Sequence, residues 1–384
     1  MKQPKLRFPE FTGDWKQHKF EDIVTIGSGK DYKHLESGNV PVYGTGGYML
    51  SVNQALSESE DAVGIGRKGT IDKPYILRAP FWTVDTLFYC IPNKGFDLTF
   101  TNCLFQNVDW KKKDESTGVP SLSKVIINNV KTYVPSLEEQ QKIASLFSEL
   151  DTLIQSAEKE LEGYRELKQG MLQKMFPKRN EVTPEIRFLE FDGNWEQCKL
   201  GDIGKTYTSL SGKTADDFGH GEANFITYMN VYSNSIADPT MVAPIEIDVK
   251  QHEVEVGDVF FTTSSETPDE VGMSCVLKEK QGIVYLNSFC FGFRPTKSFD
   301  LNFLAYMLRS NYVRNQIKIL AQGVSRYNIS KTKMMDVSII FPDYEEQKKI
   351  GECFSNLDNL INLQQKEIDG YKELKKGLLQ QMFC

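Results

Sequence analysis

Two polar loops carry the residues of this sequence that are best suited to contact nucleic acid. In the first half, Arg67 and Lys68 stand among glycines in 64–70 (GIGRKGT), where the missing side chains let the backbone approach a phosphate closely. In the second half, 323–331 (GVSRYNISK) offers hydroxyl, amide and guanidinium groups. Arginine can bind guanine, and asparagine can bind adenine, through paired hydrogen bonds. We therefore expect Arg326 and Asn328 to read bases.

Further candidates lie on loops that are rich in glycine or hydroxyl groups, such as 42–48 (VYGTGGY) and 262–267 (TTSSET). The segment 118–124 (GVPSLSK) occupies the place in the first half that 323–331 occupies in the second, which indicates a shared task. The lysine cluster 111–113, by contrast, is typical of a solvated turn. The predicted DNA-binding residues are Lys30, Tyr43, Thr45, Tyr48, Arg67, Lys68, Ser121, Ser123, Lys124, Lys213, Ser264, Ser265, Thr267, Arg326, Tyr327, Asn328, Ser330 and Lys331.

Motifs for catalysis or metal binding fail in their sequence context. Gly64, Gly66 and Gly69 spell GxGxxG, but a dinucleotide-binding loop needs a helix directly after it, and Pro74 disfavours one. The SGKT at 211–214 lacks the first glycine of a phosphate-binding loop. Seven cysteines without a CxxC and four scattered histidines indicate neither a disulfide framework nor a zinc site. We expect no metal, no cofactor and no active site in the chain itself.

The elements that support the polar loops are repeated. The segment 138–176 recurs 207 residues later as 345–383, and 18 of 31 compared positions are identical, which indicates a duplication. Both copies space apolar residues as a heptad seam, so each is predicted to be a long helix packed against a partner helix. Lys168, Lys375 and Gln364 interrupt the stripe and disfavour indiscriminate association. The seam residues are Ile143, Phe147, Leu150, Ile154, Ala157, Leu161 and Tyr164, then Ile350, Phe354, Leu357, Ile361, Ile368 and Tyr371.

Each half also begins alike, because 5–23 matches 185–203 at an offset of 180 residues. The second half therefore carries 27 more residues than the first between its two shared ends. Prolines at both ends of 177–184 mark a linker. The variable segments are predicted to be α+β domains. The expected elements are strands at 83–91, 124–134, 258–263, 283–286 and 289–293 and a helix at 302–319.

Composition is that of an ordinary globular protein, with 384 residues, 40% hydrophobic and 25% charged. A signal peptide and a membrane-spanning run are both absent from the sequence, so we expect a cytoplasmic location and no membrane partner. The net charge of −7, more than half of it on the two predicted helices, is unusual for a protein that grips DNA alone. We therefore expect weak DNA binding by the isolated chain, with phosphate neutralisation localised or supplied by partner subunits.

Two diverged domains, each followed by P-x-x-E-E-Q-x-K-I at the entry into a long helix (135–143 and 342–350), resemble the specificity subunit of type I restriction-modification systems. The RF-E-F-G-W heads and the loops VYGTGG and GRKG support this resemblance, which covers the whole chain. It implies an α+β fold of two target recognition domains joined by two long helices, which form an antiparallel intramolecular coiled coil with pseudo-two-fold symmetry. The implied domains are 1–135 (first target recognition domain), 136–176 (first spacer helix), 177–184 (linker), 185–342 (second target recognition domain) and 343–384 (second spacer helix).

The resemblance also implies a function and partners. Each target recognition domain is expected to read one half of a bipartite, asymmetric site in double-stranded DNA. The helix pair is expected to set the spacer and to dock two modification (methyltransferase) subunits, and two restriction (translocase and endonuclease) subunits complete the complex. S-adenosylmethionine, ATP and Mg are expected in those partners, so the chain itself is expected to be a non-catalytic recognition subunit.

Three alternatives explain part of the sequence. A coiled-coil scaffold or adaptor without a nucleic-acid role explains the helices, but not why two loop-rich domains diverge on similar supports. An enzyme that acts alone, such as a methyltransferase, lacks the required motifs. The recognition subunit of a restriction-modification system that cuts without translocation agrees with the sequence equally well, and copurified subunits would distinguish it.

Overall fold

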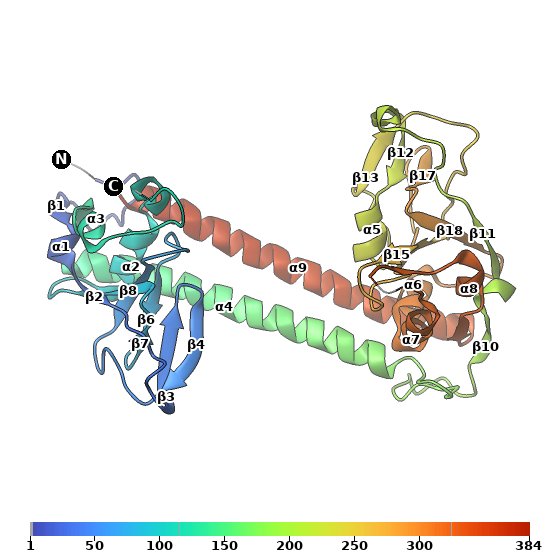
Figure 1. Ribbon diagram of the computed structural model, residues 1–384, viewed down its shortest axis with the longest axis horizontal. Helices are drawn as coiled ribbons and strands as arrows, with labels where there is room; N and C mark the ends of the chain where they lie inside the picture. Colours follow the sequence, from blue (N-terminus) through green and yellow to red (C-terminus); the bar gives the residue numbers. More distant parts are fainter. Residues whose placement is uncertain (1–2, 115, 324) are drawn as a thin grey trace. The chain divides into compact units, whose positions relative to one another are not determined.

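The computed structural model describes residues 3–114, 116–323 and 325–384, and the chain forms two compact units. The first unit comprises the residues up to Lys159 together with Gln365–Cys384, and the second comprises Glu160–Gln364. Each unit thus contains one variable domain and a part of both long helices, as can be followed in Figure 1. One residue of the predicted loop 323–331, Val324, lies outside the described residues.

Two long helices have nearly the predicted bounds, because α4 spans Leu137–Lys174 and α9 spans Tyr344–Met382. Tyr164, Ile361 and Tyr371 of the predicted seam are half-buried. The other seam residues are buried, namely Ile143, Phe147, Leu150, Ile154, Ala157, Leu161, Ile350, Phe354, Leu357 and Ile368. The heptad pattern therefore located both the helices and the face that each one buries.

Inside each unit, α4 and α9 pair in the antiparallel direction. In the first unit, Asp151 in the first half of α4 binds Lys375 in the last turns of α9 at 2.6 Å. In the second unit, Lys168 near the end of α4 binds Asp358 in the first half of α9. The two lysines that interrupt the apolar stripe thus form ion pairs at equivalent positions. The predicted antiparallel, intramolecular pairing is confirmed.

The end of each long helix completes the aromatic core of the unit that it enters. Phe383 belongs to the second sequence repeat but is buried in the first unit, and Phe176 belongs to the first repeat but is buried in the second. The rings around Phe383 are Trp15, Phe100 and Phe147, with centroids 5.3 to 6.2 Å away. The rings around Phe176 are Trp195, Phe303 and Phe354, with centroids 5.7 to 6.3 Å away.

The first unit carries a four-stranded antiparallel sheet in the order β2-β8-β5-β6 and a three-stranded sheet in the order β4-β3-β7, while β1 pairs with β9. The strands are β1 (Lys16–Lys19), β2 (Val24–Ser28), β3 (Ser37–Gly44), β4 (Gly47–Val52), β5 (Ala62–Gly66), β6 (Tyr75–Leu77), β7 (Trp82–Thr83), β8 (Leu87–Pro92) and β9 (Lys131–Val134). The short helices are α1 (Phe20–Ile23), α2 (Leu98–Gln106) and α3 (Lys124–Asn128).

The second unit repeats this plan with sheets β11-β18-β14-β16 and β13-β12-β17, while β10 pairs with β20. Its strands are β10 (Glu196–Lys199), β11 (Gly204–Tyr207), β12 (Phe218–Ile226), β13 (Val242–Ile245), β14 (Val259–Thr262), β15 (Ser264–Ser265), β16 (Ser274–Val276), β17 (Val284–Leu286), β18 (Cys290–Pro295), β19 (Tyr327–Asn328) and β20 (Ser338–Phe341). Its short helices are α5 (Tyr228–Ser233), α6 (Leu301–Arg309), α7 (Asn311–Leu320) and α8 (Lys331–Met335).

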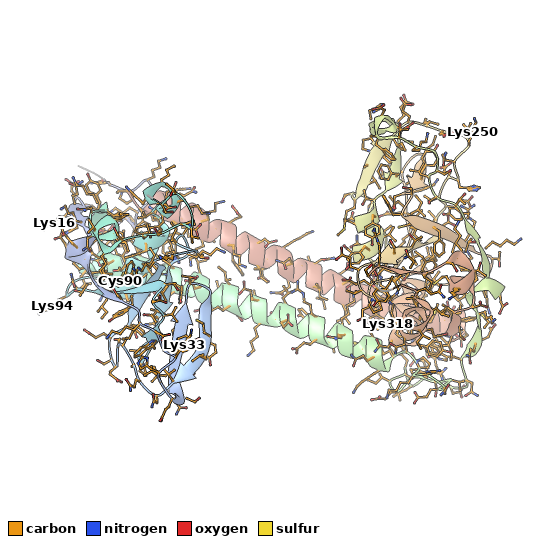
Figure 2. All side chains as sticks on the ribbon, in the orientation of Figure 1. Lys16, Lys33, Cys90, Lys94, Lys250 and Lys318 are labelled. Carbon is orange, nitrogen blue, oxygen red and sulfur yellow. The ribbon has the colours of Figure 1, made fainter. Side chains whose placement is uncertain are left out.

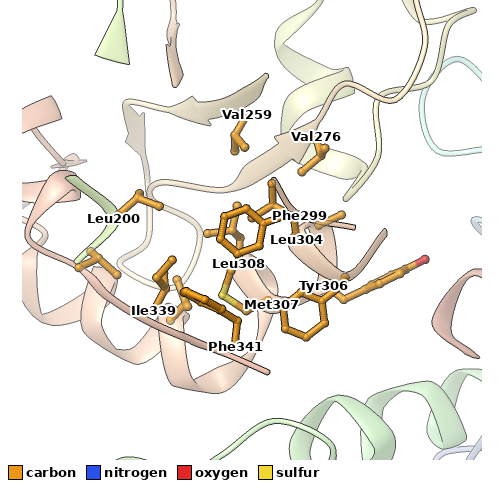
Figure 3. Packing of buried hydrophobic residues seen from close by; sticks show 14 of the residues in the cluster. Leu200, Val259, Val276, Phe299, Leu304, Tyr306, Met307, Leu308, Ile339 and Phe341 are labelled. Carbon is orange, nitrogen blue, oxygen red and sulfur yellow. The ribbon is translucent and has the colours of Figure 1, made fainter. Parts of the chain in front are cut away.

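The main core of the second unit lies between its four-stranded sheet and the helices that follow. Figure 3 shows Val259 and Val276 of the sheet near Leu304 and Leu308 of α6, with Phe341 of β20 below them. In Figure 2 the side chain of Cys90 lies inside the first unit, where the thiol is fully buried. Both cores are thus built by the faces that the apolar patterns of strands and helices predict.

Three expected elements were wrong in part. The run 124–134 was expected as one strand but forms α3 and then β9, because the Ser123 hydroxyl oxygen accepts a hydrogen bond from the amide of Ile126 at 3.2 Å and caps a helix. The expected helix 302–319 is two helices, since Ser310 between α6 and α7 has an extended backbone and its hydroxyl donates to the carbonyl of Met307. The expected strand 83–91 is likewise divided between β7 and β8.

The shared heads and helix entries of the sequence bind each other in both units. Arg7 of the first head donates from Nε and Nη2 to the two carboxylate oxygens of Glu139, each at 2.7 Å. Arg187 and Glu346 make the same two bonds at the same distances. Both carboxylates are buried, and a planar arginine matches a carboxylate with two parallel bonds. The RF heads and the E-E-Q entries are therefore two parts of one clamp.

Candidate nucleic-acid interface

In the first unit, the loop after the central strand β5 meets the segment that precedes α3. The amide of Arg67 donates to the carbonyl of Thr86 at 2.7 Å, and Lys68 forms a β-bridge with Ser121. The amide of Leu122 donates to the carbonyl of Arg67 at 2.9 Å. These backbone bonds bring two predicted DNA-binding loops together and leave the side chains of Arg67 and Lys68 exposed. We call 67–68 and 121–122 the first reading segments.

A cavity of about 410 Å³ gathers five of the predicted residues of the first unit. Its lining consists of Arg67, Lys68, Ser121, Ser123, Lys124, Ser28, Leu122 and Phe88. The Arg67 guanidinium lies 6.0 Å from the Phe88 ring centroid. Lys124 donates from Nζ to the carbonyl of Ile26 at 2.8 Å. Lys124 and the helix cap Ser123 thus support the fold, while Lys68 and Arg67 are exposed, although Arg67 also donates from Nη1 to the carbonyl of Asp85 at 3.3 Å.

The remaining predicted residues of the first unit lie elsewhere in the variable domain. Tyr43 and Tyr48 stand on the hairpin of β3 and β4 with ring centroids 6.4 Å apart, and Thr45 lies in its turn. The Tyr75 hydroxyl donates to the carbonyl of Gly44 at 2.6 Å and braces this turn, while Tyr48 is 63% exposed. Lys30 is also exposed. The hairpin therefore presents an aromatic side chain to solvent on a braced support.

In the second unit, β15 and β19 bring the other two predicted loops together. Ser264 lies opposite Asn328 and Ser265 lies opposite Tyr327 in this antiparallel pair. The amide of Ile329 donates to the carbonyl of Thr263 at 3.0 Å. The side chains of Arg326 and Asn328 are exposed. We call 263–265 and 327–329 the second reading segments.

The two sets of reading segments occupy the same place in the fold. β5 faces β8 with Gly66 opposite Leu87, and β14 faces β18 with Thr262 opposite Cys290, so both segments start after the same residue pair of equivalent strands. Lys68 thereby corresponds to Ser264, and Ser121 corresponds to Asn328. The place is cationic in the first unit and carries hydroxyl and amide groups in the second. Comparison of the two halves of the sequence had aligned 118–124 with 323–331, but it had not aligned 64–70 with 262–267.

Other predicted residues of the second unit hold the loops in place. The Ser265 hydroxyl donates to the carbonyl of Thr267, and the Thr267 hydroxyl donates to Glu270 at 2.8 Å. Ser330 caps α8, and Lys331 donates to the carbonyl of Tyr207 at 3.4 Å. Lys213 pairs with Asp248 at 2.9 Å. This hydrogen bond is the main cause that lowers the pKa of Asp248 to about 2.

Helix α5 carries two tyrosines that sequence reasoning missed. Tyr228 and Tyr232 stack with ring centroids 6.0 Å apart. The Tyr228 hydroxyl donates to the carbonyl of Ser264 at 3.2 Å, and the Tyr232 hydroxyl donates to Glu270 at 2.6 Å. The run 228–232 (YMNVY) has the four-residue aromatic spacing that places two rings on one helix face, and this was the available signal.

Two arginines, the half-buried Arg309 and the buried Arg314, fix the elements around the second reading segments, and sequence reasoning missed both. The guanidinium of Arg309 donates hydrogen bonds to several main-chain carbonyls. The guanidinium of Arg314 donates to main-chain carbonyls of the loop that leads to β16. The acceptors of Arg309 are Ser274, Val231, Tyr232 and Asn234, at 2.6 to 3.1 Å, and Ser233 at 3.5 Å. Those of Arg314 are Gly272, Asp269 and Val271, at 2.7 to 2.9 Å. Burial lowers the pKa of each to about 10, so both remain charged at neutral pH.

One of the rejected motifs, GxGxxG, contains a glycine with a plain structural role. Gly64 and Gly66 lie in β5, and a Cβ atom on Gly66 would stand 2.0 Å from the carbonyl oxygen of Thr70, so the close approach of two backbone segments explains why residue 66 is a glycine.

Throughout residues 3–114, 116–323 and 325–384, groups of three or more His, Cys, Asp or Glu side chains placed to bind a metal ion are absent. Over the same ranges, every helix is too short or too polar to cross a membrane.

Comparison with known proteins gives the same family twice along the chain. The model of the type I restriction modification DNA specificity domain matches residues 12–163 and 192–371. The type I restriction enzyme MjaVIII specificity subunit of Methanocaldococcus jannaschii is 26% identical over 294 residues, which are 70% of this chain and 65% of that protein. The putative MjaX specificity subunit of the same organism is 26% identical over 275 residues, 67% of this chain and 60% of that protein. The chain thus spans less than two thirds of the length of these relatives.

Solved structures show the same fold. The crystal structure of the S subunit of a type I restriction-modification system from M. genitalium matches 100% of this chain and 99% of its own, with a TM-score of 0.63 at 13% identity. A structure from work on complex assembly and conformational transition of the type I R-M system matches 96% of this chain and 97% of its own, with a TM-score of 0.58 at 14% identity. With its two matched regions and its two loop-bearing units, the chain belongs to the family of type I restriction modification DNA specificity domain proteins.

Proposed function

We propose that each unit reads one half of a bipartite, asymmetric site in double-stranded DNA for a type I restriction-modification complex. The observation that carries this proposal is that both units place their reading segments after equivalent strand pairs, but with different side chains. Equivalent placement agrees with two half-sites that are contacted in the same manner. Different side chains agree with two half-sites of different sequence.

The side chains of the reading segments have the chemistry that such contacts need. Arg67 and Lys68 are exposed cations, which suit phosphate contacts, and an arginine can also bind a guanine edge. Near the second segments, Asn328 and Arg326 offer amide and guanidinium donors beside the hydroxyl of Ser264. The exposed cations in and beside the reading segments are few, so tight binding to DNA requires phosphate contacts from partner subunits.

The long helices supply the surface for two copies of one partner, the modification (methyltransferase) subunit. Apolar side chains that stay exposed recur at equivalent positions of α4 and α9. These pairs are Leu137 with Tyr344, Leu153 with Leu360 and Leu167 with Leu374. Exposed apolar side chains in matched positions are typical of interaction sites. S-adenosylmethionine then binds to the modification subunits, and ATP and Mg bind to two restriction subunits.

The proposal can be tested by co-expressing the chain with its cognate modification subunit and mapping methylated adenines across a genome. The expected result is methylation at one motif with two different half-sites and a fixed spacer. Arg326→Ala should relax the motif in one half only, and Arg67→Ala should act on the other half or weaken methylation overall. Unmodified DNA from a properly assembled complex would contradict the proposal.

A second test addresses the spacer. Inserting seven residues into α4 and seven into α9 preserves the heptad seam and lengthens each helix by about 10 Å. Since base pairs are stacked about 3.4 Å apart, the unread spacer should grow by about three base pairs. The control carries an insertion of seven residues in the linker 177–184, which should leave the motif unchanged. An unchanged spacer in the helix-insertion variant would show that the helices do not measure the site.

A further inference from the structure

One exposed aromatic side chain stands beside the second reading segments. Phe289 directly precedes β18 and is 64% exposed. Its carbonyl oxygen accepts hydrogen bonds from the amide of Thr263 at 3.2 Å and from the Thr263 hydroxyl at 2.9 Å. Thr263 is followed by Ser264, which lies opposite Asn328. Phe289 is therefore bonded directly to 263–265, the second reading segment that pairs with the one carrying Asn328.

The turn that carries Phe289 is held from both sides. Asn287 is 5% exposed, and its side-chain oxygen accepts from the amide of Phe289 at 3.0 Å. Its side-chain nitrogen donates to the carbonyl of Ile226 at 3.1 Å. A large apolar side chain that a braced turn keeps in water is unfavourable until a ligand covers it. The bracing lowers the entropy that binding would otherwise cost.

The fold itself does not require an aromatic residue here. In the first unit the same place is taken by Thr86, whose carbonyl accepts from the amides of Arg67 and Lys68 at 2.7 and 3.3 Å. The correspondence follows from the strand registers, in which Leu87 and Cys290 occupy equivalent positions. Both turns use only a main-chain carbonyl to hold the reading segments. The phenyl ring is thus an addition that serves something other than the support of these segments.

We propose that Phe289 is a specificity-determining residue that packs against the C5 methyl group of a thymine in the half-site read by the second unit. The thymine methyl is the apolar group on base edges in the major groove, and phenylalanine is among the side chains that contact it. The neighbouring hydroxyl and amide groups of Ser264 and Asn328 contact the polar edges of adjacent bases. This inference rests on the proposed function of the reading segments.

The test uses the complex with the modification subunits and duplexes that carry the mapped motif. The half-site read by the second unit is the one that Arg326→Ala relaxes. In each duplex, one thymine of this half-site is replaced by deoxyuridine, which lacks the methyl group. The wild-type complex should bind one of these duplexes about three- to tenfold more weakly, as expected for the loss of one buried methyl. Phe289→Thr, which installs the residue of the first unit, should lose the same factor on thymine duplexes. It should no longer distinguish deoxyuridine from thymine at that position.

Two controls separate this contact from other effects. Leu189→Ala changes another exposed apolar residue of the second unit and should keep the wild-type preference for thymine. Deoxyuridine in the other half-site should affect wild type and Phe289→Thr equally. If no deoxyuridine duplex binds more weakly to wild type, or if Phe289→Thr still prefers thymine, the methyl contact is wrong although the bipartite motif stands. If the wild-type complex methylates no bipartite motif, the proposed function fails before this contact is reached.

Discussion

The two units are alike in the contacts that support the loops and different in the side chains that the loops present. The clamp of Arg7 with Glu139 has the same two distances as that of Arg187 with Glu346. Each unit also buries the phenylalanine at the end of a long helix among three aromatic rings. At the reading segments, by contrast, Lys68 of the first unit corresponds to Ser264 of the second. The supporting contacts of the two units have therefore diverged less than the side chains that the loops present.

The difference teaches how such a fold can change what it reads. The reading segments are held by main-chain bonds, such as that from the amide of Arg67 to Thr86 and that from the amide of Thr263 to Phe289. A main-chain bond does not depend on the side chain that is attached to it. Exposed residues at these places can thus be replaced at little cost in folding free energy, since exposed substitutions usually change stability by less than about 0.5 kcal/mol.

The largest effect is expected for the helix ends, where the two units should respond alike. Phe383→Ala and Phe176→Ala each remove a buried ring, and each should lower the free energy of unfolding by about 3–5 kcal/mol. Urea unfolding of both variants measures this, and the fully exposed Leu189→Ala serves as the control. If one phenylalanine can be replaced with little loss, the two aromatic cores are not equivalent supports.

The arginine clamps should give unequal losses in the two units, neither of them larger than those at the helix ends. The indole nitrogen of Trp15 also donates to Glu139 at 3.2 Å, whereas that of Trp195 is buried without a partner among the described residues. Arg187→Ala therefore leaves Glu346 buried and without its cationic partner, a loss of about 3–5 kcal/mol. Arg7→Ala should cost less, because the indole bond to the carboxylate remains.

Thermal and urea unfolding of the two single variants measure this difference. Removing both partners, as in Arg187→Met with Glu346→Leu, eliminates the uncompensated charge and should recover much of the stability. The matched pair in the first unit is Arg7→Met with Glu139→Leu. Arg187 also donates to the carbonyls of Gly193 and Asp192, at 2.6 and 2.9 Å. Equal losses in Arg7→Ala and Arg187→Ala would therefore show that neither these bonds nor the tryptophan bond contributes to the difference.

Elements that are determined by a local, repeated sequence pattern could be predicted from the sequence. Elements that depend on a single residue or on contacts distant in the sequence could not. The long helices, their partner and their buried face follow from a periodic pattern that every turn repeats, so α4 and α9 lie within two residues of their predicted bounds. The break at Ser310 rests on one extended residue between two helical runs. A local apolar pattern of the helix type continues across it, and therefore could not reveal it.

The candidate site was predictable as a set of loops but not as a surface. Glycine, hydroxyl and cationic residues mark 64–70 and 323–331 as exposed loops, which the structure confirms for Arg67, Lys68 and Arg326. The bonds of Lys124, Lys213 and Lys331 to carbonyls or carboxylates depend on groups that are distant in the sequence. The role of Arg309, which binds carbonyls of α5 and β16, depends on the packing of three elements and has no local signature.

The ion pairs of the helix seam should give a still smaller effect. Lys168→Asp and Lys375→Asp each place two carboxylates in contact, and each should lower stability by about 1 kcal/mol, the upper range for partly exposed pairs. The reversed pair Lys375→Asp with Asp151→Lys should restore it. The reversed pair Lys168→Asp with Asp358→Lys should restore only a part, because Asp358 also accepts a hydrogen bond from the Tyr306 hydroxyl at 2.6 Å. Double-mutant cycles from urea unfolding measure the coupling. A coupling energy in one pair only would mean that the ion pair stabilises the pairing of α4 with α9 in one unit alone.

The smallest effect concerns the acid–lysine pairs that hold loops in the variable domains. Lys213 lowers the pKa of Asp248 to about 2, and Lys111 lowers the pKa of Asp72 in the first unit by the same kind of hydrogen bond. A carboxyl group whose pKa is depressed on folding stabilises the fold at pH values above its usual pKa, near 4. This contribution to stability is lost as the pH falls toward the pKa of the folded state.

Lys111→Met should therefore return Asp72 close to its usual pKa. Lys213→Met should raise the pKa of Asp248 only in part, because Asp248 also accepts from the amide of Lys250 and from Gln251. Carboxyl-carbon NMR titration of both variants measures the shifts, and full recovery at Asp248 would show that the lysine alone organises the loop of the second unit.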